Sequence, residues 1–150
     1  MRAVLGSRSC IVCGQDNLTG LRLRFAVDEK GSSASWEARA PFEGFPGVIH
    51  GGIVLALLDD AMWYAALGSV GPTLTAEATV RYHRRLEIGM TVDVRGAVES
   101  RHGRICLCRA ELCAEGGVIA RANGKFLPVP EAERDRLVGA GLVHEIPAHQ

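Results

Sequence analysis

Apolar and polar residues alternate along most of the chain, which is the pattern of β-strands with one buried face. In the first such segment Leu21, Leu23 and Phe25 alternate with Arg22 and Arg24. The pattern recurs five more times, and turn residues separate several of the segments. The six expected strands cover residues 21–27, 34–39, 74–82, 92–99, 105–114 and 118–127.

Residues 53–67 form the one long segment with a different pattern. They are apolar nearly all round, so we expect a buried helix and not a surface helix. Gly68 is expected to end it, because glycine is common just past the C-terminus of a helix. A short second helix is expected over residues 131–138, followed by a loose tail.

The predicted elements run in the order of two strands, one helix and four strands. An α+β fold satisfies this order, with an antiparallel six-stranded sheet wrapped around one long central helix. A parallel α/β sheet does not, because its helices would alternate with its strands. One helix covers only part of such a sheet, so we expect the remainder, or its edge, to pair with another copy of the chain.

Length and charge narrow the possible functions. The 150 residues predict a single domain (1–150), with a core over about 20–127, a flexible N-terminal segment and a C-terminal tail. Basic and acidic residues number 17 each, which argues against nucleic acid or a membrane as the partner, since both attract basic patches.

The longest apolar run, residues 53–58, is too short to span a bilayer. The first residues lack the apolar segment of an export signal, so we expect a cytoplasmic protein.

The five cysteines are an odd number, and without an export signal a disulfide framework is not expected. Cys106 and Cys108 share one face of a predicted strand and are expected in the core. Cys10-x-x-Cys13 has the spacing of half a zinc site, but no second pair follows at ribbon spacing. A structural turn is the expected role, no metal ligand is predicted, and zinc stays open as the alternative.

The start of the long helix carries the first candidate for chemistry. The helix follows His50-Gly51-Gly52 and has no serine, threonine, aspartate or asparagine cap. The first N–H groups of a helix have no internal partner and carry partial positive charge. Glycine lets a ligand approach them, so they are a candidate oxyanion hole. The alternative is that the glycines only permit a tight turn.

Two adjacent acids inside this apolar helix are the second candidate. Asp59 and Asp60 lie about 100° apart around the helix, so both cannot easily point outward. Asp59 shares a face with Met62 and Trp63, where desolvation raises the pKa of a carboxyl group. This environment is typical of a general base or nucleophile. The alternative is a carboxylate held by a neighbouring arginine.

The unit His50-Gly51-Gly52 followed by Asp59 resembles the signature of hotdog-fold acyl-CoA thioesterases of the 4-hydroxybenzoyl-CoA thioesterase superfamily. The most similar branch is the phenylacetate-degradation type. The resemblance covers roughly residues 10–127 and implies the α+β hotdog fold. The supporting segments are Cys10-Ile11-Val12-Cys13-Gly14, residues 20–25, Gly44-Phe45-Pro46-Gly47, and residues 74–82.

The resemblance also implies roles for individual residues. The Gly51 N–H would polarise the thioester carbonyl, and His50 would orient the site or contact that carbonyl. Asp59 would be the nucleophile or general base, opposite Gly51 of the partner subunit across a dimer interface. Thr75 would help to hold the attacking water. The alternatives are a loop-bracing hydrogen bond for His50 and an ordinary strand position for Thr75.

The sequence departs from the family pattern in two places. Arg85 stands where relatives usually carry proline, and residues 42–49 lack an asparagine that some relatives have before the histidine. Arg84 and Arg85 can pair with coenzyme A phosphates, which suit bidentate arginine, or they can be solvated surface charges.

A groove beside the helix is expected to hold the acyl chain. Trp63 and Met62 would line it, and Phe42 and Phe45 would close it from the loop. Gly52 is also expected to contact the substrate.

These features predict hydrolysis of acyl-CoA thioesters by a homodimer or a homotetramer built as a dimer of dimers. Neither a metal nor an organic cofactor is expected, because coenzyme A is part of the substrate. Two alternatives stay open. A hotdog hydratase or dehydratase would use His50 facing Asp59, whereas a non-catalytic acyl-CoA-binding protein would keep the glycines and arginines without needing the acid.

Overall fold

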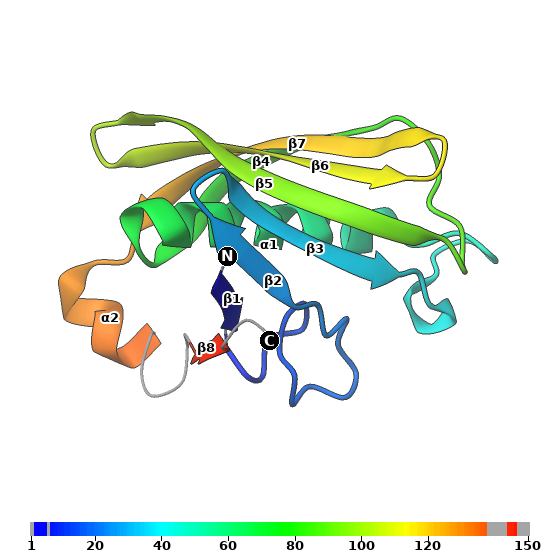
Figure 1. Cartoon of the computed structure of the whole chain (residues 1–150), viewed down its shortest axis with the longest axis horizontal. Helices are drawn as coiled ribbons and strands as arrows, with labels where there is room; N and C mark the ends of the chain where they lie inside the picture. The colour runs from blue at the N-terminus through cyan, green and yellow to red at the C-terminus, as the bar shows by residue number, and fades with distance from the viewer. Residues whose placement is uncertain (1, 6, 138–143, 147–150) are drawn as a thin grey trace.

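The computed structural model describes residues 2–5, 7–137 and 144–146 and shows one long helix lying against a single antiparallel sheet (Figure 1). The strand order is β4-β7-β6-β5-β3-β2-β1-β8. This is the predicted α+β hotdog arrangement, in which β2 to β7 are the six expected strands. The strands are β1 (Arg2–Leu5), β2 (Phe25–Asp28), β3 (Gly31–Glu37), β4 (Thr73–Tyr82), β5 (Thr91–His102), β6 (Ile105–Ala114), β7 (Gly117–Pro128) and β8 (His144–Ile146). The helices are η1 (Ala40–Phe42, 3-10), α1 (Gly51–Val70) and α2 (Glu131–Leu137).

The first predicted strand is shorter than its alternating pattern indicates. Arg22 has a φ of 59°, which breaks the extended backbone, so β2 begins only at Phe25. The Leu21 and Leu23 N–H groups instead donate to the Ile11 and Val12 carbonyls at 2.8 and 3.0 Å. The pattern therefore located the buried residues correctly, but their backbone partner is the N-terminal loop and not the sheet.

The long helix is the core helix of the fold. It runs to Val70 and not to residue 67, and Gly71 with a φ of 87° takes the role expected of Gly68. Although α1 is long and apolar enough to cross a membrane by length and composition, it packs under the sheet. Its buried residues are Val54, Leu57, Leu58, Ala61, Met62, Tyr64, Ala65 and Ala66.

A glycine sets how closely the middle of α1 approaches the sheet. A Cβ atom on Gly96 of β5 would lie 2.1 Å from the Ala61 carbonyl oxygen, which is closer than any real contact. The Ser32 hydroxyl of β3 donates to the same carbonyl. The turn of the helix that carries Asp59 and Asp60 is therefore fixed against β3 and β5.

The core extends further than residues 20–127. Val12, Cys13 and Val129 are buried, so the N-terminal loop contributes to the packing of the domain. Cys106 and Cys108 are buried, as the shared strand face predicts. The predicted terminal helix is confirmed as α2 over Glu131–Leu137, whereas residues 138–143 and 147–150 of the predicted tail lie outside the described residues.

Candidate active site

The start of α1 is built by the loop before it. The His50 N–H donates to the Phe42 carbonyl at 3.0 Å, and the Ile49 N–H donates to the Leu86 carbonyl at 2.8 Å. His50 is the N-cap residue, and its Nδ1 accepts a hydrogen bond from the Gly52 N–H at 2.8 Å. The prediction of an uncapped helix is therefore wrong, because histidine takes the role usually filled by serine or aspartate.

One backbone donor at this helix start remains available. Within the described part of the chain, the Gly51 N–H donates to no acceptor, and Gly51 is exposed. Gly52 is exposed as well, but its N–H is bound to His50. The candidate oxyanion donor is thus the single N–H of Gly51, at the positive end of a twenty-residue helix.

The cap also fixes the tautomer of His50. A ring nitrogen that accepts a hydrogen bond carries no proton, so the proton of the neutral ring is on Nε2. His50 is exposed, and its Nε2–H is a donor that a bound carbonyl group can use. The two interpretations of His50 are therefore compatible: Nδ1 braces the helix start, and Nε2–H is the group that can orient a substrate.

The acid on the helix is held by the strand that follows it. The Thr75 hydroxyl of β4 donates to Asp59 Oδ1 at 2.9 Å. The β4–β7 register shifts between Thr75 and Glu77, and such a bulge re-aims a neighbouring side chain. Burial raises the pKa of the Asp59 carboxyl above its ordinary value, and the Thr75 hydrogen bond partly opposes this.

Among the described residues, no arginine holds this carboxylate. The ion pairs between described side chains join other residues, and burial and Thr75 are the causes of the Asp59 pKa shift. The alternative of an arginine-bound Asp59 is therefore wrong. A half-buried acid with one hydroxyl partner keeps lone pairs for a water molecule or a substrate carbon.

The sequence interpretation missed Tyr82 at the far end of β4. Its hydroxyl donates to the Gly51 carbonyl at 2.7 Å, on the residue whose N–H is the candidate donor. The alternation placed Tyr82 on a strand but gave no sign of this partner. β4 thus contacts α1 at both candidate groups, through Thr75 at Asp59 and through Tyr82 at Gly51.

Gly51 and Asp59 are far apart within one chain. Eight residues of helix separate them, which is about 12 Å along the axis. The nearby strand β4 is a sheet edge, and its Leu74 and Tyr82 are 49% and 48% exposed. An edge strand offers unpaired backbone groups to another chain, so the surface beside both residues is open to a second copy.

The residues expected to line an acyl groove differ in their placement. Met62 is fully buried in the core, so its prediction as a groove residue is wrong. Trp63 is half-buried, and its Nε1–H donates to the Thr73 carbonyl at 2.7 Å. Phe45 is 82% exposed, and Phe42 is half-buried against Trp36.

The two predicted phosphate-binding arginines also differ. Arg84 Nη2 donates to the Glu115 carbonyl at 2.8 Å, so this side chain braces the turn between β6 and β7. Arg85 is exposed and makes no hydrogen bond or ion pair with the rest of the described chain. Arg85 is consequently the freer of the two cations.

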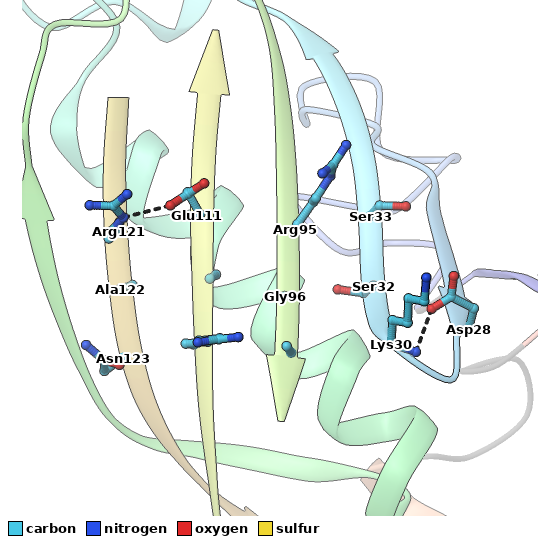
Figure 2. Close-up of a pocket in the computed structure, with 13 residues that line it drawn as sticks. Asp28, Lys30, Ser32, Ser33, Arg95, Gly96, Glu111, Arg121, Ala122 and Asn123 are labelled. Atoms are coloured by element: carbon cyan, nitrogen blue, oxygen red, sulfur yellow. Dashed lines mark hydrogen bonds and ion pairs between the residues drawn. The ribbon is translucent and has the colours of Figure 1, made fainter. Parts of the chain in front are cut away.

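A cavity of ≈ 700 Å³ lies on the sheet face that points away from α1 (Figure 2). The strand register aligns Ser33, Arg95, Glu111 and Arg121 across four neighbouring strands. Ser32, the residue before Ser33, faces α1, so the aligned side chains point to the opposite face of the sheet. The Arg121–Glu111 ion pair at 2.7 Å crosses this surface. None of the predicted site residues lines the cavity, so it is separate from the Gly51 and Asp59 region.

Comparison with known protein families gives a match. The model of the thioesterase superfamily matches residues 46–120, half of the 150 residues. No curated protein matches the chain significantly.

Three solved structures share the fold. A thioesterase superfamily protein is 24% identical with a TM-score of 0.75 over 80% of this chain, which spans only 60% of that protein. A mutant of the phenylacetic acid degradation protein PaaI from Thermus thermophilus is 26% identical, with a TM-score of 0.68 over 73% of this chain and 95% of its own. A phenylacetic acid degradation-related protein from Ralstonia eutropha JMP134 is 23% identical, with a TM-score of 0.65 over 71% and 85%.

Proposed function

The chain belongs to the thioesterase superfamily, and from this premise we propose that it hydrolyses acyl-CoA thioesters to a free acid and coenzyme A. The observation that carries the proposal is the pair of groups beside β4. The Gly51 N–H is free at the positive end of α1, and Asp59 is a half-buried carboxylate held by Thr75. An oxyanion donor and a base or nucleophile are the two groups that acyl transfer requires.

Two copies of the chain form the proposed site. The Gly51 N–H and Asp59 are about 12 Å apart along one helix, too far to act on the same carbonyl. In a twofold dimer the Gly51 end of one helix lies opposite the Asp59 region of the other, and the arrangement occurs twice. The exposed edge strand β4 supports this pairing. The functional unit is therefore a homodimer, and a tetramer would be a dimer of such dimers.

The reaction divides between the two groups. The Gly51 N–H donates to the thioester oxygen as negative charge develops on it. Asp59 either removes a proton from the attacking water or attacks the acyl carbon itself to form an anhydride. In both routes the carbon–sulfur bond breaks, and the coenzyme A thiolate leaves and takes up a proton. In the second route a water molecule then hydrolyses the anhydride, which releases the free acid and restores the Asp59 carboxylate. Trapping an acylated Asp59 by rapid quench and mass spectrometry separates the two routes.

Other residues position the substrate. His50 holds the helix start through Gly52, and its Nε2–H is available to the substrate carbonyl. Trp63 and Phe45 are the proposed apolar contacts of the acyl group. Arg85 is the proposed phosphate contact, with Arg84 contributing only if it leaves the Glu115 carbonyl. The hydrolysis itself needs no metal or organic cofactor, and a cytoplasmic location stays a prediction.

A panel of acyl-CoA substrates with thiol detection tests this function on the purified protein. Release of one thiol per substrate consumed supports a thioesterase. Conversion of an enoyl-CoA without thiol release would show a hydratase instead. Saturable acyl-CoA binding without any turnover would show a binding protein. The acyl group that gives the highest kcat/KM then identifies the substrate class.

A further inference from the structure

Three potential metal ligands meet on the side of α1 where the N-terminal loop packs. The Sγ atoms of Cys10 and Cys13 and a carboxylate oxygen of Asp60 all lie within 4.8 Å of one another. The cysteines come from the loop after β1, and the acid comes from the middle of α1. Asp60 is adjacent in sequence to Asp59 but takes no part in the contact with Thr75.

The loop presents both sulfurs in a tight turn. The Gly14 N–H donates to the Cys10 carbonyl at 2.9 Å, and the Val12 N–H approaches Cys10 Sγ at 3.3 Å. Leu21 then joins the loop to the next segment through the Ile11 carbonyl. The two thiols therefore share one side of a loop whose backbone is fixed independently of them.

The acid in the cluster lacks a partner for one of its buried oxygens. Asp60 Oδ2 is buried and has no hydrogen bond within the described residues. A buried carboxylate oxygen without a partner is costly and needs an explanation. Cys13 is only 4% exposed, so solvent does not supply the partner from that side. A cation between the three side chains would satisfy the oxygen.

We propose that Cys10, Cys13 and Asp60 bind one zinc ion, with the fourth position filled by a water molecule. Two sulfurs on one zinc lie at most about 4.6 Å apart, because each Zn–S bond is about 2.3 Å. The three ligand atoms all lie within 4.8 Å of one another, so a small movement of the side chains brings the two sulfurs within that span. Thiolates favour zinc over magnesium or calcium, and a carboxylate is a normal zinc ligand. Cys10 is only half-buried, which leaves a path for the water.

Tyr64 provides support around the proposed ion. It lies one helical turn after Asp60, and its hydroxyl interacts with the Cys13 thiol. Its ring stacks on Phe25 at 4.5 Å between centroids, which fixes its orientation. A residue that orients a ligand in this way is a common feature of metal sites.

The zinc would be a structural clamp and has no step in the proposed hydrolysis. It would join the loop before β2 to the turn of α1 that carries Asp59. A disulfide between Cys10 and Cys13 is the competing interpretation. It would constrain the loop but would leave Asp60 Oδ2 without a partner, so the carboxylate favours the metal.

Cobalt titration of the reduced, metal-free full-length protein tests the proposal without any activity measurement. We expect one cobalt ion per chain, a thiolate-to-cobalt charge-transfer band, and the intense visible bands of a four-coordinate ion. Zinc should abolish these bands and raise the Tm, whereas magnesium should do neither. An absence of the charge-transfer band in the wild-type protein would overturn the proposal, and so would a Cys10–Cys13 disulfide together with no cobalt binding after reduction.

Variants identify the ligands. Cys10→Ser, Cys13→Ser and Asp60→Asn should each weaken cobalt binding by at least about 100-fold, more than the loss of a supporting residue costs. Cys113→Ser is the matched control, because Cys113 lies outside the cluster beside Glu111, and it should bind as the wild type does. Equal binding by Asp60→Asn and the wild type would contradict the role of the carboxylate. Because every readout is metal binding, failure here is distinguishable from failure of the proposed hydrolysis.

Discussion

The Thr75 hydroxyl of β4 donates a 2.9 Å hydrogen bond to Asp59 Oδ1 of α1. The contact joins the edge strand of the sheet to the half-buried acid of the core helix. At its other end the same strand binds the helix start through Tyr82 and Gly51. β4 therefore positions both candidate catalytic groups relative to the edge where a second chain can pair.

Replacing Asp59 by asparagine should abolish most turnover. The amide keeps the shape but can neither remove a proton nor attack, so we expect kcat to fall about 10²- to 10⁴-fold. Thiol release from the best acyl-CoA substrate measures the change. Glu99→Gln is the control, because Glu99 lies on β5, away from the β4 edge, and pairs with Arg109 of β6. Wild-type turnover in Asp59→Asn would remove Asp59 from the mechanism.

The same variant should fold normally. Burial raises the pKa of Asp59 in the folded state, so the group favours folding less as pH rises from the ordinary carboxyl pKa through the raised one. At neutral pH asparagine removes this unfavourable contribution, and the Tm should be equal to that of the wild type or higher. The gain should shrink as the pH falls through the raised pKa, and it should be absent below the ordinary one.

Removing the Thr75 hydroxyl should change the pH profile as well as the rate. The hydrogen bond lowers the pKa of Asp59, so Thr75→Ala should move the acid limb of kcat/KM to higher pH. We expect kcat to fall about tenfold, in line with the loss of a hydrogen bond to a charged group, with a smaller change in KM. Thr75→Ser should restore both. A large loss of substrate affinity with unchanged kcat would contradict the assignment of Thr75 to Asp59 and the attacking water.

Tyr82→Phe should lower activity without moving the acid limb. It removes the 2.7 Å bond to the Gly51 carbonyl and loosens the helix start, while Asp59 keeps Thr75. We expect a few-fold lower kcat and about 1 kcal/mol less stability toward urea. A shifted acid limb would show that Tyr82 acts on Asp59 instead.

Gly96→Ala should destabilise the fold. The added Cβ would lie 2.1 Å from the Ala61 carbonyl oxygen, so α1 must move off β5. The free energy of unfolding in urea should fall by about 1–3 kcal/mol. Gly51→Ala is the control, because a Cβ there meets only the Tyr82 ring and hydroxyl at 3.5 Å or more. Equal stability of Gly96→Ala and the wild type would show that this close approach does not exist.

The sequence predicted the order of strands and the long helix, because the alternation of a strand and the apolar character of a buried helix can be read from neighbouring residues. They failed where distant segments decide the outcome. The pairing of Leu21 with Ile11 and the positive φ of Arg22 depend on the N-terminal loop. Met62 was predicted to line a groove because the sequence of a helix that is apolar nearly all round does not indicate which of its sides is exposed.

The sequence predicted which residues belong to the candidate site, and the structure corrected the contacts that these residues make. Asp59 and Gly51 stand out in the sequence because an acid and a glycine pair are unusual in an apolar helix. The cap by His50 and the bond from Tyr82 require the folded loop and strand. Asp60 was recognised only as the neighbour of Asp59, since its cysteine partners are far away in the chain.

Mixed dimers test the composite site most directly. Gly51→Pro deletes the proposed donor where a helix tolerates proline, at its first residue, and His50 with a ψ of 135° suits the residue before proline. Alone it should lose about 10²- to 10³-fold in kcat.

A purified heterodimer of Gly51→Pro and Asp59→Asn chains has one intact site and one doubly defective site. We predict that it recovers about half of the wild-type turnover per dimer, as a twofold site requires. A heterodimer as inactive as its two parents would contradict a site shared between subunits.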